Sequence, residues 1–155
     1  MKLNLNGSPL ALLDAPSLTA RRTAAASALA STYLSREDTK SMLMVGTGTL
    51  SPNMIRAHAA IRPIEEVFIW GRTKSNALAV AESLDGENFK VSVVETIEEK
   101  ASSVDLISVA TMSMTPLIKG EWLQAGQHLD LVGAYRPDMR ESDDTAIKRC
   151  RITST

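Results

Sequence analysis

The most informative segment of this chain is Met42-Leu43-Met44-Val45-Gly46-Thr47-Gly48-Thr49-Leu50-Ser51-Pro52. It joins a short apolar run to a glycine turn and a helix-start signal, an order that predicts strand, tight turn and helix. Folds that bind dinucleotides use this order to hold a pyrophosphate at the start of the helix. Gly46 permits the turn, and Gly48 lets the backbone approach the phosphates. With Thr49 and Leu50 they form the predicted pyrophosphate-binding set.

The third glycine of the dinucleotide fingerprint is absent, and Ser51 stands in its place. Serine is small enough to let the helix pack closely on the strand. Ser51 followed by Pro52 also predicts a helix N-cap with proline at the first helical position. The alternative interpretation is a glycine turn in an α/β domain that binds some other ligand.

A second apolar run, at 67–70, ends in Gly71-Arg72-Thr73, where dinucleotide-binding folds read the adenosine ribose. This position has no Asp or Glu, the residues that bind the free 2′-hydroxyl of NAD. Arg72, Thr73 and the neighbouring Lys74 instead favour the 2′-phosphate of NADP. The alternatives are a surface arginine at a strand end and a solvated lysine in the next helix.

Apolar runs and helix-like segments alternate along the rest of the chain. The predicted strands cover residues 10–13, 42–45, 67–70, 89–94, 104–109 and 128–132. The predicted helices cover residues 17–34, 52–60, 75–84, 97–101 and 142–148, with a loop or short helix at 117–123. Strands that alternate with helices pair in parallel. The sequence therefore predicts an α/β fold: one Rossmann-like domain over 1–155, with a doubly wound, mainly parallel sheet and helices on both faces.

The segment 17–34 is rich in alanine and is the clearest helix candidate. Ser17 or Thr19 is predicted to cap it. Apolar residues recur on one face at near-helical spacing, as in an amphipathic helix: Leu18, Ala25, Leu29 and Tyr33.

Two later segments are expected to face the same crevice as the glycine turn. They are Ala110-Thr111-Met112-Ser113, after the fourth core strand, and Val132-Gly133-Ala134, after the fifth. Ligands of open α/β sheets lie outside the carboxyl ends of the strands. Thr111 and Met112 are therefore candidates for the nicotinamide side, and Gly133 next to Val132 would let the ring approach the backbone. Taken singly, each is more commonly a loop residue.

Charge and cysteine content exclude several classes of protein. A formal net charge of −1 gives no sign of a nucleic-acid or anionic-membrane surface. The one cysteine, Cys150, supplies neither an internal disulfide nor a metal-ligand pattern, so no metal is predicted. The chain has no apolar signal region and no apolar run of ~20 residues, which makes the cytoplasm the default location.

The remaining ionisable candidates are predicted to be structural. His58 and His128 have no partner evident in the sequence and do not form a metal pair. The mixed-charge run at 138–144 is typical of a solvated loop and helix cap.

Several segments together form a pattern that a general dinucleotide-binding domain lacks. They are 12–14, Leu18-Thr19-Ala20-Arg21-Arg22-Thr23-Ala24-Ala25, 45–48, 69–73, Thr111 with Thr115-Pro116, 132–134, Arg136-Pro137-Asp138 and Arg140-Glu141. In these residues the chain resembles the ornithine cyclodeaminase/mu-crystallin family of NAD(P)-dependent enzymes. The resemblance implies hydride chemistry on a small molecule, an amino acid or its cyclic imine. It also implies that Arg22 reaches the cofactor phosphate and the substrate carboxylate, and that the full-length form is a homodimer.

Two departures from this family bear on the function. Ornithine cyclodeaminases carry a proton-transferring Asp shortly after the Val-Gly of the fifth core strand, whereas Tyr135 stands at the matching position here. This favours the ketimine-reductase branch, which reduces cyclic imines such as pyrroline- or piperideine-2-carboxylate with NADPH. The chain also resembles the family's cofactor domain alone, without its substrate and dimerisation domain, and is expected to be inactive by itself. The alternatives are an NAD-dependent ornithine cyclodeaminase, which forms proline and ammonia, and a non-catalytic NADP-binding module.

Overall fold

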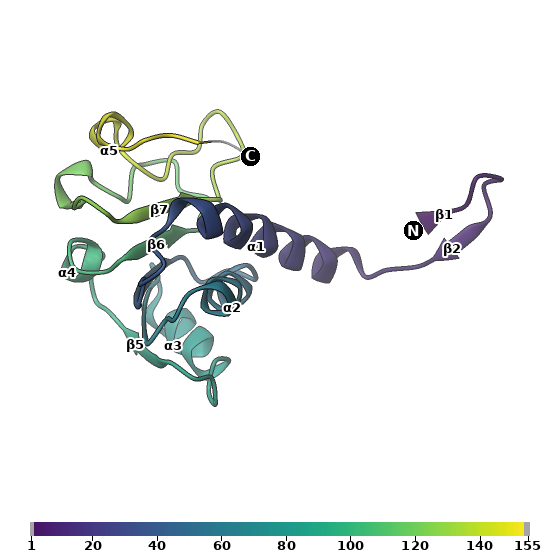
Figure 1. Ribbon diagram of the computed structural model, residues 1–155, viewed down its shortest axis with the longest axis horizontal. Helices are drawn as coiled ribbons and strands as arrows, with labels where there is room; N and C mark the ends of the chain where they lie inside the picture. Colours follow the sequence, from purple (N-terminus) through teal and green to yellow (C-terminus); the bar gives the residue numbers. More distant parts are fainter. Residues whose placement is uncertain (1, 154–155) are drawn as a thin grey trace.

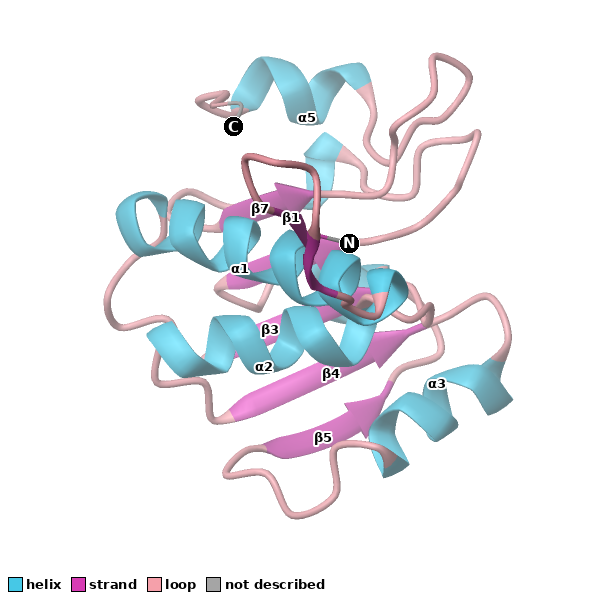
Figure 2. Cartoon of the chain, turned by 90° about the vertical axis from the view of Figure 1, so that its right-hand side faces the viewer, coloured by secondary structure: helices cyan, strands magenta, loops and turns pink. Residues whose placement is uncertain are grey.

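The computed structural model describes residues 2–153 and contains the predicted doubly wound sheet. Five parallel strands lie in the spatial order β5-β4-β3-β6-β7 (Figure 2). Their bounds are β3 (Ser41–Val45), β4 (Glu66–Trp70), β5 (Lys90–Val93), β6 (Leu106–Val109) and β7 (His128–Leu131). The strand order reverses between β3 and β6. Ligands of open α/β sheets bind at such a point, outside the carboxyl ends of the strands.

Helices cover both faces of the sheet. Their bounds are α1 (Ala15–Leu34), α2 (Ser51–Ile61), α3 (Lys74–Glu82), α4 (Glu98–Ala101) and α5 (Asp144–Arg149), with a short 3₁₀ helix, η1 (Gly120–Trp122). Met42 and Met44 of β3 pack in one cluster with residues of α1, α2 and α3. Leu43 and Val45 pack in a second cluster with residues of α4 and α5. β3 is apolar from Met42 to Val45 because successive side chains enter these two cores alternately.

The long helix α1 begins earlier than predicted. The side chain of Asp14 caps it and accepts a hydrogen bond from the backbone N–H of Ser17 at 2.9 Å. The prediction of a cap at Ser17 or Thr19 is therefore wrong. Ser17 instead donates an N–H that has no partner within the helix, and the carboxylate of Asp14 accepts it.

The buried face of α1 is built from small side chains. They belong to Ala20, Ala24, Ala28 and Ser31. The bulky stripe predicted from the spacing lies on the exposed side instead, where Tyr33 is 80% exposed and Leu29 60%. Small residues let α1 lie close to α2 and the sheet. Most of the apolar surface of α1 is therefore on the outward face of the helix.

The first residues of the described chain form a β-hairpin that projects away from the sheet (Figure 1). It consists of β1 (Lys2–Leu3), which the sequence did not predict, and the antiparallel β2 (Pro9–Ala11), which overlaps the strand predicted at 10–13 but begins and ends earlier. The hairpin and the segment that joins it to α1 expose large apolar side chains: Leu3, Leu5, Leu10, Leu12 and Leu13. We call residues 2–13 the apolar arm. Within residues 2–153, no helix is long and apolar enough to cross a membrane.

Candidate functional site

The glycine turn after β3 lies at the reversal point of the strand order. Gly46 has a φ of 119°, in the region that favours glycine, and its N–H donates to the carbonyl of Trp70 at 2.9 Å. A Cβ at Gly46 would lie 2.5 Å from the carbonyl oxygen of Ala110. Both backbone conformation and close packing therefore require glycine here, and the turn joins the ends of β3, β4 and β6.

Gly48 is a different kind of glycine. It is exposed, its φ is not positive, and a Cβ built on it would meet no atom within 4 Å. Neither folding nor packing within the described residues explains its lack of a side chain. An open glycine beside a helix start is the arrangement that a close-lying phosphate requires.

The start of α2 is suited to an anion. Leu50 occupies the N-cap position and makes no side-chain cap. The N–H of Ser51 donates to the carbonyl of Gly48 at 3.0 Å, and Pro52 has no N–H, so the first turn of α2 offers an incoming oxygen the N–H of Asn53. Ser51 is not the predicted cap but the first residue of the helix. Its buried hydroxyl donates to the carbonyl of Gly46 at 2.8 Å and so fixes the turn against the helix.

The end of β4 carries the predicted ribose-reading residues. Arg72 is exposed and has no ion pair within the described part of the chain. Thr73 is the N-cap residue of α3 but makes no side-chain cap, so its hydroxyl is not committed to the helix. Lys74 forms an exposed ion pair with Glu95. Arg72 is therefore the cation at this strand end that is best placed to accept a phosphate.

The loops after β6 and β7 meet through Glu141, a residue of the charged run that the sequence predicts to be solvated. Glu141 is only 2% exposed. One of its carboxylate oxygens accepts from the N–H of Thr111 at 2.7 Å, and the other accepts from the N–H of Gly133 at 2.8 Å. The prediction of a solvated loop at 138–144 is thus wrong for Glu141. Nothing in the spacing between Glu141 and Gly133 along the sequence predicts that the Glu141 side chain is buried.

The remaining predicted residues of these loops differ in exposure. Met112 is 71% exposed beside Thr111, and Tyr135 is 73% exposed after Gly133. Val132 is half-buried, and its N–H donates to the carbonyl of Val109 at 2.9 Å.

Arg22 lies on the exposed side of α1, and its side chain takes part in no hydrogen bond or ion pair of the described residues. Ser31 of α1 lies beside His128 at the start of β7, whereas Ser27 lies beside Asp130 further along the strand. α1 therefore runs from the carboxyl edge of the sheet towards the amino edge. Arg22, which precedes Ser27, lies in the direction of the edge that carries the glycine turn.

A buried polar cluster connects α1 and α2 to the sheet. Asp130 accepts from the hydroxyls of Ser27 at 2.8 Å and Ser108 at 2.9 Å, and lies 3.3 Å from Nε2 of His58. Burial alone would raise the pKa of Asp130, but the bonds from His58 and the two serines outweigh it and lower the pKa. His58 is fully buried, and its Nδ1 is the one buried side-chain polar atom without a partner within residues 2–153. Both predicted structural histidines thus contact packed elements of the fold.

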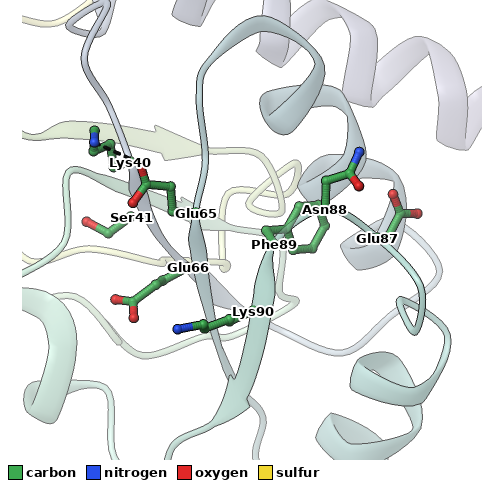
Figure 3. A pocket seen from close by; sticks show the side chains of 8 residues that line it. All are labelled: Lys40, Ser41, Glu65, Glu66, Glu87, Asn88, Phe89 and Lys90. Atoms are coloured by element: carbon green, nitrogen blue, oxygen red, sulfur yellow. Dashed lines mark ion pairs between the residues drawn. The ribbon is translucent and has the colours of Figure 1, made fainter.

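A hollow lies at the amino ends of the strands, opposite the glycine turn. It has a volume of about 650 Å³ and lies at the amino ends of β3, β4 and β5 (Figure 3). An ion pair of 2.7 Å between Lys40 and Glu65 lies at its rim. None of the residues that line this hollow begins a helix. Among the described residues no group of three His, Cys, Asp or Glu could hold a metal ion.

The strand order, the helices on both faces and the glycine turn together define a Rossmann-like α/β domain. Within this class the chain belongs to the ornithine cyclodeaminase/mu-crystallin family, whose model matches residues 3–155.

Characterised relatives agree with this assignment. The chain is 38% identical to a Delta(1)-pyrroline-2-carboxylate reductase of Paracoccus denitrificans over 92% of its length, and 37% identical to the ketimine reductase mu-crystallin of Macropus fuliginosus over 94%. It is similar to the structure of Delta(1)-pyrroline-2-carboxylate reductase from Thermococcus litoralis, in complex with NADH and L-proline, with a TM-score of 0.88 and 33% identity over 92% of the chain. The chain spans 45% of the length of each of these three proteins.

Proposed function

We propose that this chain is the NADP-binding domain of a reductase that acts on a cyclic imine carboxylate. The observation that carries the proposal is the open Gly48 beside the uncapped start of α2, at the reversal point of the sheet. The names of the relatives from Paracoccus and Macropus, both reductases of cyclic imines or ketimines, support the reaction. NADH in the Thermococcus structure supports a nicotinamide cofactor.

Each predicted residue has a role in this proposal. The backbone from Gly46 to Leu50, which includes Thr49, binds the pyrophosphate. Gly71, Arg72 and Thr73 receive the adenosine ribose, and Arg72 pairs with the 2′-phosphate. Lys74 can contribute only by giving up Glu95, so its share is smaller. The order of the strands then directs the nicotinamide half over β6 and β7.

The nicotinamide half of the site consists of Thr111, Met112, Val132 and Gly133. When bound, NADPH supplies the hydride that the imine carbon accepts. Arg22 is proposed to hold the substrate carboxylate from α1. Tyr135 is exposed next to Gly133, and no proton-transferring role is assigned to it.

The reaction is tested with the protein expressed from the complete gene that encodes these residues. Oxidation of NADPH on addition of pyrroline-2-carboxylate or piperideine-2-carboxylate, followed at 340 nm, would support the proposal. Release of ammonia from ornithine in the presence of NAD would support a cyclodeaminase instead. Binding of cofactor without either reaction would identify a non-catalytic NADP-binding module.

A further inference from the structure

Glu141 is a buried carboxylate that no cation of the described residues neutralises. Its Oε1 accepts from the N–H of Thr111 at 2.7 Å and from Thr111 Oγ1 at 2.8 Å, and its Oε2 accepts from the N–H of Gly133 at 2.8 Å. A buried charge is unfavourable unless hydrogen bonds satisfy it. These three bonds satisfy both oxygens, and two of their donors belong to the backbone.

The hydrogen-bond geometry favours glutamate over glutamine and aspartate at this position. Both oxygens face N–H donors, so the NH₂ group of a glutamine would meet a donor at either Thr111 or Gly133. An aspartate is one methylene shorter and cannot reach both loops from the same backbone position. The backbone of Glu141 is itself anchored, because its carbonyl accepts from the N–H groups of Leu117 and Ile118 at 2.9 Å each.

The carboxylate connects two loops that the chain sequence separates. Thr111 follows β6 and Gly133 follows β7, and a Cβ at Gly133 would collide with the backbone of Thr111. The loops are therefore packed directly on each other, with Glu141 as their common acceptor. Arg72 marks the adenosine end of the crevice at β4, on the other side of the glycine turn. The two loops form the floor of the opposite end.

We propose that Glu141 is a positioning residue for the nicotinamide ring. It fixes the gap between Thr111 and Gly133, and this gap sets the orientation in which the ring presents its hydride to the imine carbon. The inference rests on the proposed function, since it needs a nicotinamide cofactor in this crevice. It predicts that a change at Glu141 affects the nicotinamide half of the cofactor and spares the adenosine half.

The test compares Glu141→Gln with Glu121→Gln, the same chemical change at an exposed carboxylate. Calorimetry gives the affinities for NADPH and for 2′,5′-ADP, which carries only the adenosine half. We expect Glu141→Gln to keep the affinity for 2′,5′-ADP within about twofold and to weaken NADPH about tenfold, as expected for the loss of a hydrogen bond to a charged group. The emission of bound dihydronicotinamide should also move towards that of free NADPH. Glu121→Gln should change none of these quantities.

Two other outcomes would overturn the inference. One is unchanged NADPH affinity and emission in Glu141→Gln, and the other is an equal loss of both ligands in a variant that still melts cooperatively. A wild-type chain that binds neither ligand would instead refute the proposed function, which separates the two failures. If Glu141→Gln does not fold, Thr111→Val removes the bond from the Thr111 hydroxyl to Glu141 at 2.8 Å, together with a longer one of 3.4 Å that this hydroxyl accepts from the N–H of Ser113. It should weaken NADPH about threefold with 2′,5′-ADP unchanged, and no difference there would also refute the role of Glu141.

Discussion

Arg72 and Lys74 illustrate how neighbouring cations acquire different roles. Lys74 is already paired with Glu95, whereas Arg72 has no ion pair within residues 2–153. We predict that Arg72→Ala weakens NADPH by about 10- to 100-fold and leaves NADH within about twofold, because a charge-assisted bond to the 2′-phosphate is lost. Calorimetric titration measures both, with Lys90→Ala, at the opposite edge of the sheet, as control. Equal losses for the two cofactors would argue against a role at the 2′-phosphate.

His128 gives the chain a pH-dependent stability. Burial lowers its pKa below the ordinary value of 6.5; His58 and Arg62 add to this shift and Asp130 opposes it. A lowered pKa means that the unfolded chain binds the proton first, so stability is full above pH 6.5 and falls as the pH drops through the folded-state pKa. We predict that the melting temperature of the wild type decreases on acidification from about pH 7.5 to 5, and that His128→Gln shows a flatter profile. Parallel profiles would exclude His128 as the source.

At the scale of the element, the strand–turn–helix unit could be predicted almost completely. Strands buried on both faces are uniformly apolar, and the glycine spacing marks the turn, so both signals are local. The orientation of α1 could not be predicted, because its inward face is alanine and serine while bulky residues such as Tyr33 point outwards. The burial of Glu141 was equally hidden, since its partners Thr111 and Gly133 come from separate loops that meet only in the folded sheet.

The two glycines of this unit should respond oppositely to alanine. Gly46→Ala forces a side chain into positive φ and against the carbonyl of Ala110, so we predict a loss of stability of about 1–3 kcal/mol or more. Gly48→Ala meets no neighbouring atom and should melt like the wild type, yet weaken dinucleotide binding by occupying the space of the pyrophosphate. Thermal melts and calorimetry on both variants test this. Unchanged cofactor affinity in Gly48→Ala would mean that the pyrophosphate lies elsewhere.

Outside its two cores, the molecule exposes many large apolar side chains. The apolar arm carries Leu5 at 110% and Leu12 at 86% exposure, and the outer face of α1 separately exposes Leu29 and Tyr33. Contiguous apolar patches on a soluble chain favour association. Association of two copies of the chain would cover part of this surface.

We predict that the 155-residue chain self-associates at micromolar concentration. Replacing Leu10 and Leu12 together by serine should shift it towards the monomer without lowering its melting temperature, because both side chains are exposed. Leu78→Ser, an isolated exposed leucine on α3, serves as the control and should not change the oligomeric state. Light scattering after size-exclusion chromatography measures the mass. A monomeric wild type would show that the apolar arm is tolerated in water.

A calorimetric titration of the wild-type chain with NADPH and with NADH tests most directly whether the glycine turn binds a dinucleotide. We predict saturable one-to-one binding, tighter for NADPH, and displacement of NADPH by 2′,5′-ADP. Binding of neither nucleotide would contradict this role, because the glycine turn and the start of α2 would then have another purpose. Tighter binding of NADH would leave the crevice in place and overturn the assignment of Arg72 to a 2′-phosphate.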